Sequence, residues 1–314
     1  MKRTLYFGNP YHLSVRRKQF CFRAKDGTLE DSCPIEDLGI LVLDHPALSM
    51  TVPLLLELAA ANVAVVFCDK SHLPAAQLLS LNGHSLQQKY QSAQVEASQP
   101  LKKRLWQQTV VSKIMNQQIL LRQLGKDSGP LKRYAATVKS GDSDNREAAA
   151  AQYYWPALWG QGFIRQTRSG MSAAKNAEVS GNALSADPFA ESWGNVNFLL
   201  NYGYAVLRAA VARALIGSGL LISYGIHHHN QYNPYPLADD VMEPYRPFVD
   251  SMVMQLQQKH EKKEAKRHLL GLLACDVSIG RVRRPLLNAL SITSASLQRC
   301  FSGESRKLEY PRFT

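Results

Sequence analysis

Three segments of the chain contain the acids and imidazoles that a divalent-cation site needs. Glu147 opens an alanine-rich run, three histidines occupy residues 227–229, and Asp240 and Glu243 stand three residues apart. Hard cations such as Mg²⁺ and Mn²⁺ favour carboxylate oxygens, and Mn²⁺ also accepts an imidazole. Such sites most often serve phosphodiester chemistry, so the three segments predict a metal-dependent site of this kind.

The two acids at positions 240 and 243 share a helical face if this segment is helical. Two ionised carboxylates side by side repel each other unless a cation or a basic group lies between them. The alternative interpretation is helix capping, and it is the stronger one for the neighbouring Asp239. Capping is a weaker explanation for Glu243, because that residue lies past the capping turn.

The histidine trio leaves the identity of a ligand open. Side chains alternate in an extended segment, so His227 and His229 cannot easily share a site with His228. A lone histidine is more often packed or solvated than metal-bound, and Glu147 in a first helical turn could simply complement the helix dipole. No cysteine or spaced histidine pair completes a tetrahedral set, which disfavours zinc.

The charge of the chain indicates a polyanionic partner. The 314 residues carry a formal net charge of +12. Residues 1–80 hold eight basic and eight acidic side chains, so the whole excess lies in residues 81–314. A solvated basic face is the plain alternative, but a surface that follows nucleic-acid phosphates is the better explanation. The candidate phosphate contacts are Lys102, Lys103, Arg104, Arg146, Arg165, Arg168, Arg246, Arg281, Arg283 and Arg284.

The hydrophobic pattern predicts an α+β protein: a small β-sandwich-like domain over residues 1–80, then a larger all-α domain over residues 81–314. Alternating apolar positions dominate the first part, whereas helical spacing dominates the second. We expect helices over residues 53–62, 85–124 (divided near Pro100), 147–159, 195–221, 239–268 and 281–301. The five scattered cysteines and the lack of a long apolar N-terminal stretch predict a cytoplasmic protein.

Taken in order, several segments resemble the signature motifs of the CRISPR-associated integrase family (CRISPR-associated protein one), the catalytic subunit of spacer acquisition. These segments are residues 65–69 with His72-Leu73-Pro74, residues 145–151, residues 201–207, Gly225-Ile226-His227-His228 and residues 240–247. The resemblance covers nearly the whole chain. Residues 230–234 and the longer gap that follows them look most like the type II systems.

The resemblance implies a site and a reaction. Its ligands would be Glu147, His228 and Glu243 around Mg²⁺ or Mn²⁺, with Asp240 as a further ligand or a partner behind them, and Arg246 orienting Glu243. The family joins the 3′-hydroxyl of a spacer precursor to a CRISPR repeat by transesterification. It implies a homodimer built through the β domains and a small ferredoxin-like partner (CRISPR-associated protein two).

Two alternatives stay open. One is a free-standing metal-dependent nuclease that acts on branched DNA or RNA. The other is a basic DNA-binding scaffold without enzymatic activity, whose acids and histidines serve stability. No G-x-x-x-x-G-K-[ST] segment occurs, so no nucleotide-driven motor is implied.

Overall fold

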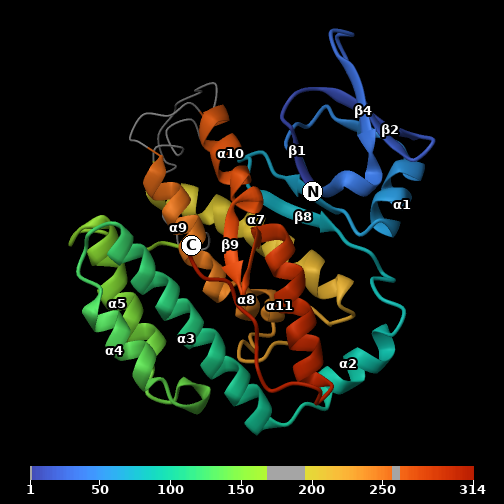
Figure 1. The fold of residues 1–314 in the computed structure, drawn as a ribbon. Helices are drawn as coiled ribbons and strands as arrows, with labels where there is room; N and C mark the ends of the chain where they lie inside the picture. Colours follow the sequence, from blue (N-terminus) through green and yellow to red (C-terminus); the bar gives the residue numbers. More distant parts are fainter. Residues whose placement is uncertain (1, 168–194, 257–261) are drawn as a thin grey trace.

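The computed structural model describes residues 2–167, 195–256 and 262–314 (Figure 1). The N-terminal part is built from two four-stranded sheets that face each other, as expected for a sandwich. The first sheet has the order β1 (Arg3–Phe7), β5 (Leu38–Leu43), β7 (Ala64–Cys68), β8 (Pro74–Leu78). The second has the order β4 (Glu30–Pro34), β3 (Gln19–Ala24), β2 (Tyr11–Arg16), β6 (Ser49–Met50).

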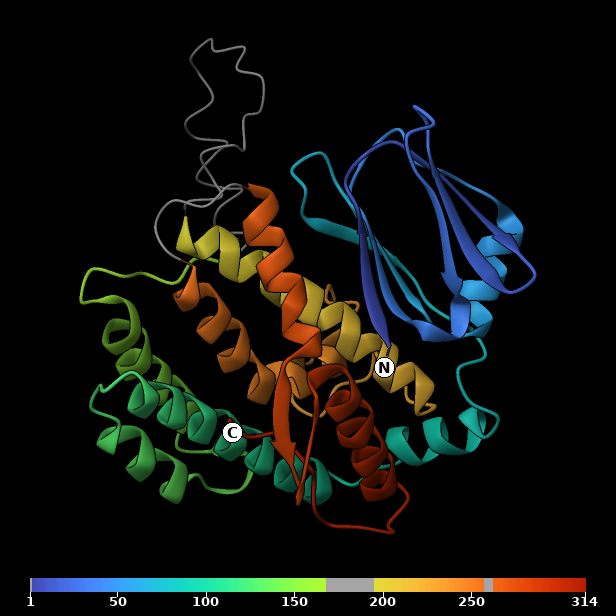
Figure 2. The same cartoon turned by 45° about the horizontal axis from the view of Figure 1, so that its top comes forward.

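Strand β5 explains how the two parts of the chain hold together. All six of its residues are buried, because both faces of its sheet are covered. Leu41 and Leu43 point into the sandwich core, which helix α1 (Val52–Ala60) completes with Leu54 and Leu58. Ile40 and Val42 belong instead to the core of the helical part. The sheet of β5 is therefore a shared wall, and Figure 2 shows it beside the helices.

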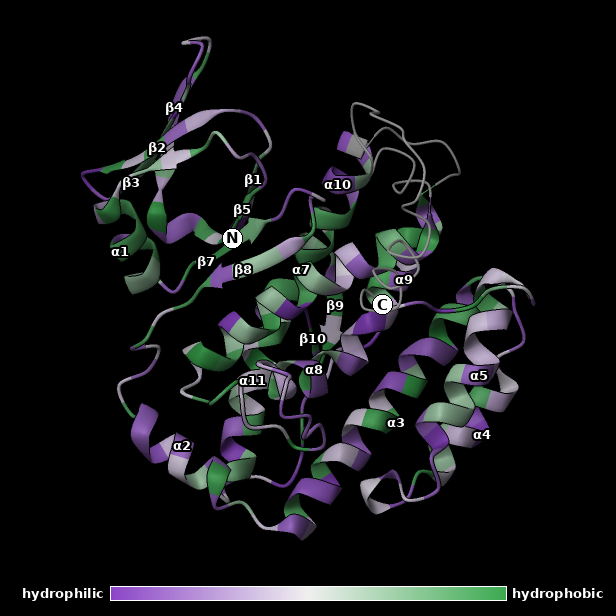
Figure 3. Cartoon of the chain, turned by 180° about the vertical axis from the view of Figure 1, so that it is seen from behind, coloured by the Kyte–Doolittle hydropathy of each residue, from purple (hydrophilic) through white to green (hydrophobic). Residues whose placement is uncertain are grey.

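The helical part of the chain begins at Gln87, after β8 has ended at Leu78. Helix α3 is the longest and packs against α4, α5 and α9, and its turns alternate between hydrophilic and hydrophobic in Figure 3. The helices are α2 (Gln87–Val95), α3 (Gln99–Gln123), α4 (Gly129–Thr137), α5 (Arg146–Trp159), α7 (Val196–Gly217), α8 (Pro236–Met242), α9 (Arg246–Gln255), α10 (Lys262–Gly271) and α11 (Leu286–Phe301).

Helix α7 is the axis of the helical part. It is long and apolar enough to cross a membrane, but 78% of its most apolar window is buried inside the protein. It touches β7 and β8 on one side and α8, α9 and α11 on others. This burial is that of a central core helix.

The helical part is not exclusively helical. Strands β9 (Asp276–Ile279) and β10 (Val282–Pro285) form an antiparallel hairpin around Gly280, whose φ is +59°. The expected helix from residue 281 was therefore wrong at its start, and α11 begins only after Pro285. The helix expected from residue 239 begins earlier, at Pro236, and a 3₁₀ turn over Glu243–Tyr245 divides it from α9. Pro244 and Pro247 remove two backbone donors there, which favours this break.

Candidate active site

The first turn of α5 presents Glu147. The side chain of Asp142 accepts hydrogen bonds from the backbone N–H of Arg146 (2.8 Å) and of Glu147 (3.1 Å), although it lies outside the helix. Asn145 enters the helix with a left-handed φ of 55°. Asp142 is 8% exposed, and no sequence pattern singles it out. It satisfies the free donors of the first turn and so fixes the direction of Glu147.

Asp240 holds the histidine segment in place. Its Oδ2 accepts from the backbone N–H of Ile226 (2.6 Å) and His227 (2.9 Å), and its Oδ1 accepts from the N–H of His228 (3.2 Å). A Cβ at Gly225 would lie 2.6 Å from the carbonyl oxygen of His228 and 2.9 Å from Asp240 Oδ2, so only glycine fits there. Asp240 is fully buried with its oxygens occupied in this way, which makes it an orienting group.

His228 is the histidine that the fold directs to the site. Its Nδ1 lies 2.5 Å from Asp240 Oδ1, so the ring's other nitrogen, Nε2, remains for a ligand. This hydrogen bond raises the pKa of His228 despite the opposing effect of burial. His227 stacks instead on Trp106, with ring centroids 4.2 Å apart, and His229 is exposed. The rings of His227 and His228 nevertheless lie edge to face with centroids 5.7 Å apart, so the alternation expected for an extended segment does not keep these two rings apart.

Lys113 of α3 joins the two outer acids. Its Nζ lies 2.6 Å from Glu147 Oε1 and 2.5 Å from Glu243 Oε2. Since both oxygens contact one nitrogen, they are at most 5.1 Å apart. Burial alone would lower the pKa of Lys113, but Glu243 and Glu147 outweigh it and raise the pKa, so the amine stays charged. The sequence did not distinguish Lys113 from the other polar residues of this helix.

Glu243 is 4% exposed, and two cationic side chains accompany it. Arg246 Nε lies 2.8 Å from its Oε1, on the opposite side from Lys113. Burial by itself would raise the pKa of Glu243, but Arg246 and Lys113 lower it, so the side chain is ionised. The Arg246 guanidinium also lies over the ring of Tyr204, 4.8 Å from its centroid. Arg246 therefore orients Glu243, the role that the resemblance implied for it.

The donor set suits a hard cation. Glu243 Oε2 is buried, and its partner is the ammonium of Lys113 at 2.5 Å. A carboxylate oxygen in this state has a free lone pair. As the side chains stand, no three His, Cys, Asp or Glu residues in the described part of the chain are gathered closely enough to hold an ion. The ammonium of Lys113 occupies the space between the carboxylates.

The predicted phosphate contacts fall into different environments. Lys102 was a wrong prediction: it is 4% exposed, and its Nζ lies over the ring of Tyr224 at 4.6 Å. Arg165 donates to Asn197 (3.1 Å) and Asn201 (2.6 Å) near the start of α7. Arg168 lies outside the described residues. The exposed candidates lie near the start of α3 and on the hairpin, namely Lys103, Arg104, Arg281, Arg283 and Arg284. Arg146 is half-buried beside Asp144.

Comparisons with known proteins decide the family. The profile described as "CRISPR associated protein Cas1" matches residues 5–159 and 193–269. The chain belongs to the Cas1 family. The "CRISPR-associated endonuclease Cas1" of Neisseria meningitidis is 34% identical over 303 residues, which cover 94% of this chain and 91% of that one. A second such endonuclease, from Francisella tularensis, is 22% identical over 248 residues.

Solved Cas1 structures share the fold of this family member. A CAS1 protein from Thermotoga maritima superposes with a TM-score of 0.72 at 14% identity, and the match covers 96% of this chain and 98% of that one. A casposase bound to an integration product gives a TM-score of 0.73 at 18% identity, over 98% of this chain and 92% of that one. These likenesses confirm the α+β Cas1 architecture.

Proposed function

We propose that this Cas1 protein is a metal-dependent DNA integrase of CRISPR adaptation. The observation that carries the proposal is the meeting of Glu147 and Glu243 at Lys113, with His228 held by Asp240 from the adjoining segment. The Neisseria relative is named an endonuclease, and the casposase was solved on an integration product, which supports strand cleavage and joining as the reaction class.

Glu147, Glu243 and the Nε2 of His228 would hold one Mg²⁺ or Mn²⁺. When bound, the cation would polarise a phosphoryl oxygen and stabilise charge on the attacking or leaving oxygen. Asp240 keeps the His228 proton on Nδ1, so that Nε2 presents its lone pair. Arg246 neutralises Glu243 from the side opposite Lys113. A cation would compete with Lys113 for the two carboxylates.

The proposed reaction exchanges one phosphodiester for another. The 3′-hydroxyl oxygen of a spacer precursor forms a bond to phosphorus at the edge of a CRISPR repeat. The bond from the same phosphorus to the 3′ oxygen of the nucleotide adjoining the repeat breaks; the attacking hydroxyl loses its proton, and the leaving oxygen takes one up to become a new 3′-hydroxyl. The number of phosphodiester bonds is unchanged, so the step needs no ATP.

We further propose DNA, a second copy of this chain and a small Cas2 protein as partners. The balanced charge of residues 1–80 suits contacts between proteins, and the basic excess of residues 81–314 suits DNA. One chain of a Cas6-RT-Cas1–Cas2 complex contains this fold, with a TM-score of 0.68 over 98% of this chain and 35% of that one. We assign the protein to a type II system on the segment over residues 230–234.

A strand-transfer assay tests the proposal. The assay mixes purified protein and Mn²⁺ with a duplex that has free 3′ ends and with a supercoiled plasmid that carries a CRISPR repeat. Wild type should give branched, joined products. The Glu147→Ala variant should give none, although it should still bind DNA. Shortened strands without joined products would instead indicate a free-standing nuclease. DNA binding without any product in Mg²⁺ or Mn²⁺ would indicate a non-enzymatic scaffold.

A further inference from the structure

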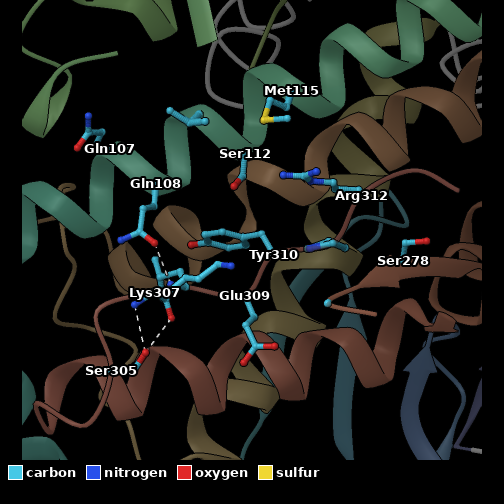
Figure 4. A pocket seen from close by; sticks show the side chains of 14 residues that line it. Gln107, Gln108, Ser112, Met115, Ser278, Ser305, Lys307, Glu309, Tyr310 and Arg312 are labelled. Atoms are coloured by element: carbon cyan, nitrogen blue, oxygen red, sulfur yellow. Dashed lines mark hydrogen bonds between the residues drawn. The ribbon is translucent and has the colours of Figure 1, made fainter. Parts of the chain in front are cut away.

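A hollow of about 680 Å³ lies on a face of α3 that is turned away from the candidate active site (Figure 4). Trp106 and Lys113, which face the site, are two helical turns apart on the other side of this helix. The helix therefore separates the hollow from the carboxylates. Its contribution to the hollow is Gln107, Gln108, Val111, Ser112 and Met115, which share one helical face.

The opposite wall of the hollow is the segment over residues 305–312, which α3 holds by hydrogen bonds. The Gln108 side chain accepts from the backbone N–H of Leu308 (2.9 Å) and donates to the carbonyl of Arg306 (3.1 Å). Asn116 donates to the carbonyl of Pro311 (3.0 Å). The wall is thus fixed without a ligand, and binding would require little further ordering of the chain.

Two arginines, one from the hairpin and one from the segment over residues 305–312, flank Ser278 beside the hollow. Ser278 of β9 is paired with Arg283 of β10 on one side and with Arg312 on the other, and both pairings are antiparallel. Directly opposed residues in antiparallel strands project from the same face of the sheet. The three side chains therefore form a row, and Ser278 and Arg312 line the hollow itself.

The hollow carries surplus positive charge. Lys307 and Arg312 line it, and Glu309, the acid of the lining, is neutralised by an ion pair with Arg299 at 2.9 Å. Lys307, Arg312 and Arg283 are exposed and form no ion pair with any other described residue. Ser112, Ser278 and Ser305 add hydroxyl groups to the lining of the hollow (Figure 4).

We propose that the hollow and the arginine row bind the sugar-phosphate backbone of a DNA strand, as a second contact surface apart from the active site. Guanidinium, ammonium and hydroxyl groups are the donors that phosphates take, and such contacts hold DNA without reading its sequence. An acidic peptide would meet the same charges. DNA is favoured because the whole basic excess of the chain lies in this part of it. The choice of DNA rests on the proposed function.

Equilibrium binding of labelled DNA tests the proposal on the full chain in EDTA, where catalysis is absent. The test variant is the double substitution Arg283→Gln/Arg312→Gln. The control variant, Arg122→Gln/Arg133→Gln, also removes two positive charges, but from exposed positions of α3 and α4. We expect the first variant to bind about ten-fold more weakly at low salt. The slope of the logarithm of its binding constant against the logarithm of the salt concentration should become shallower by roughly two, since each phosphate contact contributes about 0.9 to that slope. The control should lose much less.

Equal losses in both variants, or no loss in either, would overturn the proposal. Unchanged DNA binding together with lost binding of polyglutamate would assign the surface to an acidic protein instead. Lys307→Gln, at an exposed side chain, gives a second test if the double variant fails to fold, and it should weaken binding with a slope change of about one. Failure of the proposed function is read separately, by Glu147→Ala in strand transfer.

Discussion

Glu147 and Glu243 come from distant parts of the chain and meet at one atom, the Nζ of Lys113, at 2.6 and 2.5 Å. Without a cation between them the two carboxylates would repel each other at this separation. The network continues through Arg246 to the ring of Tyr204, whose hydroxyl donates to the buried Asp250. The site is therefore held by charges that extend into the core.

Removing the ammonium by Lys113→Met should destabilise the protein by about 3 kcal/mol in EDTA, because it leaves two acids without their shared cation. Mn²⁺ should restore part of this loss, since it would bind between the freed carboxylates. Urea unfolding of wild type and variant, with EDTA and with Mn²⁺, measures both effects. If Mn²⁺ raised the free energy of unfolding of wild type and variant equally, the ion would not compete with Lys113.

Asp240→Asn should weaken Mn²⁺-dependent strand cleavage and raise the Mn²⁺ concentration that supports it by about 10–100-fold. The amide nitrogen cannot accept from the backbone N–H groups of the histidine segment, so His228 loses its fixed direction. Asp239→Asn is the matched control, because Asp239 accepts instead from the Asn233 amide at 2.7 Å. A similar loss of strand cleavage in both variants would show that Asp240 has no special role.

Asp250 should give the protein a pH-dependent stability. Burial raises its pKa from 3.8 to about 6, although hydrogen bonds from Tyr204 and Tyr154 oppose this. The folded chain therefore keeps a proton that the unfolded chain releases near pH 4. The retained proton adds about 3 kcal/mol to the free energy of unfolding at low pH, and this contribution is lost as the pH rises through about 6.

Asp250→Asn removes that titration and keeps an oxygen for the tyrosines. We expect the free energy of unfolding of wild type, relative to the variant, to fall by about 3 kcal/mol between pH 4 and pH 7. Chemical denaturation at several pH values measures it. Parallel profiles for the two proteins would mean that Asp250 does not titrate in this range.

Lys266 of α10 and Asp44 form a buried ion pair between the helical part and the β-sandwich. Their side chains are 3% and 1% exposed, and Asp44 also accepts from Tyr6 at 2.6 Å. Lys266→Met should cost about 3 kcal/mol, because it removes the ammonium from a buried carboxylate and leaves it with the His72 imidazole at 2.8 Å and the Tyr6 hydroxyl. Lys266→Met/Asp44→Asn should recover part of the loss in the same unfolding experiment. A double variant no more stable than the single one would contradict this explanation.

Much of the fold could be predicted because its elements depend on local periodicity. Alternation marked β2 and β3, and a short aliphatic run marked β5. Pro100 stands near the start of α3, in the stretch where the sequence predicts a division between two helices. The hairpin was missed because four-residue strands offer too few alternating positions. The further bridge from Ser278 to Arg312 joins β9 to a segment that lies beyond α11, which local patterns do not reveal.

The site was only partly predictable for a similar reason. The residues alone left the histidine open, and the family resemblance selected His228, which the fold then placed on Asp240. Lys113 and Lys102 looked alike, as polar positions in one helix, yet one joins two acids and the other packs on Tyr224. Nothing local distinguishes them, because their partners come from other helices and loops.

Joint binding of one cation by Glu147, His228 and Glu243 is tested most directly by calorimetric titration of Mn²⁺ into the protein without DNA. We predict saturable binding to wild type, with affinity at least about ten-fold lower in Glu147→Gln and in His228→Ala. Glu30→Gln, which alters an exposed carboxylate of the sandwich, should bind as wild type does. Unchanged affinity in Glu147→Gln would contradict the assignment of the site.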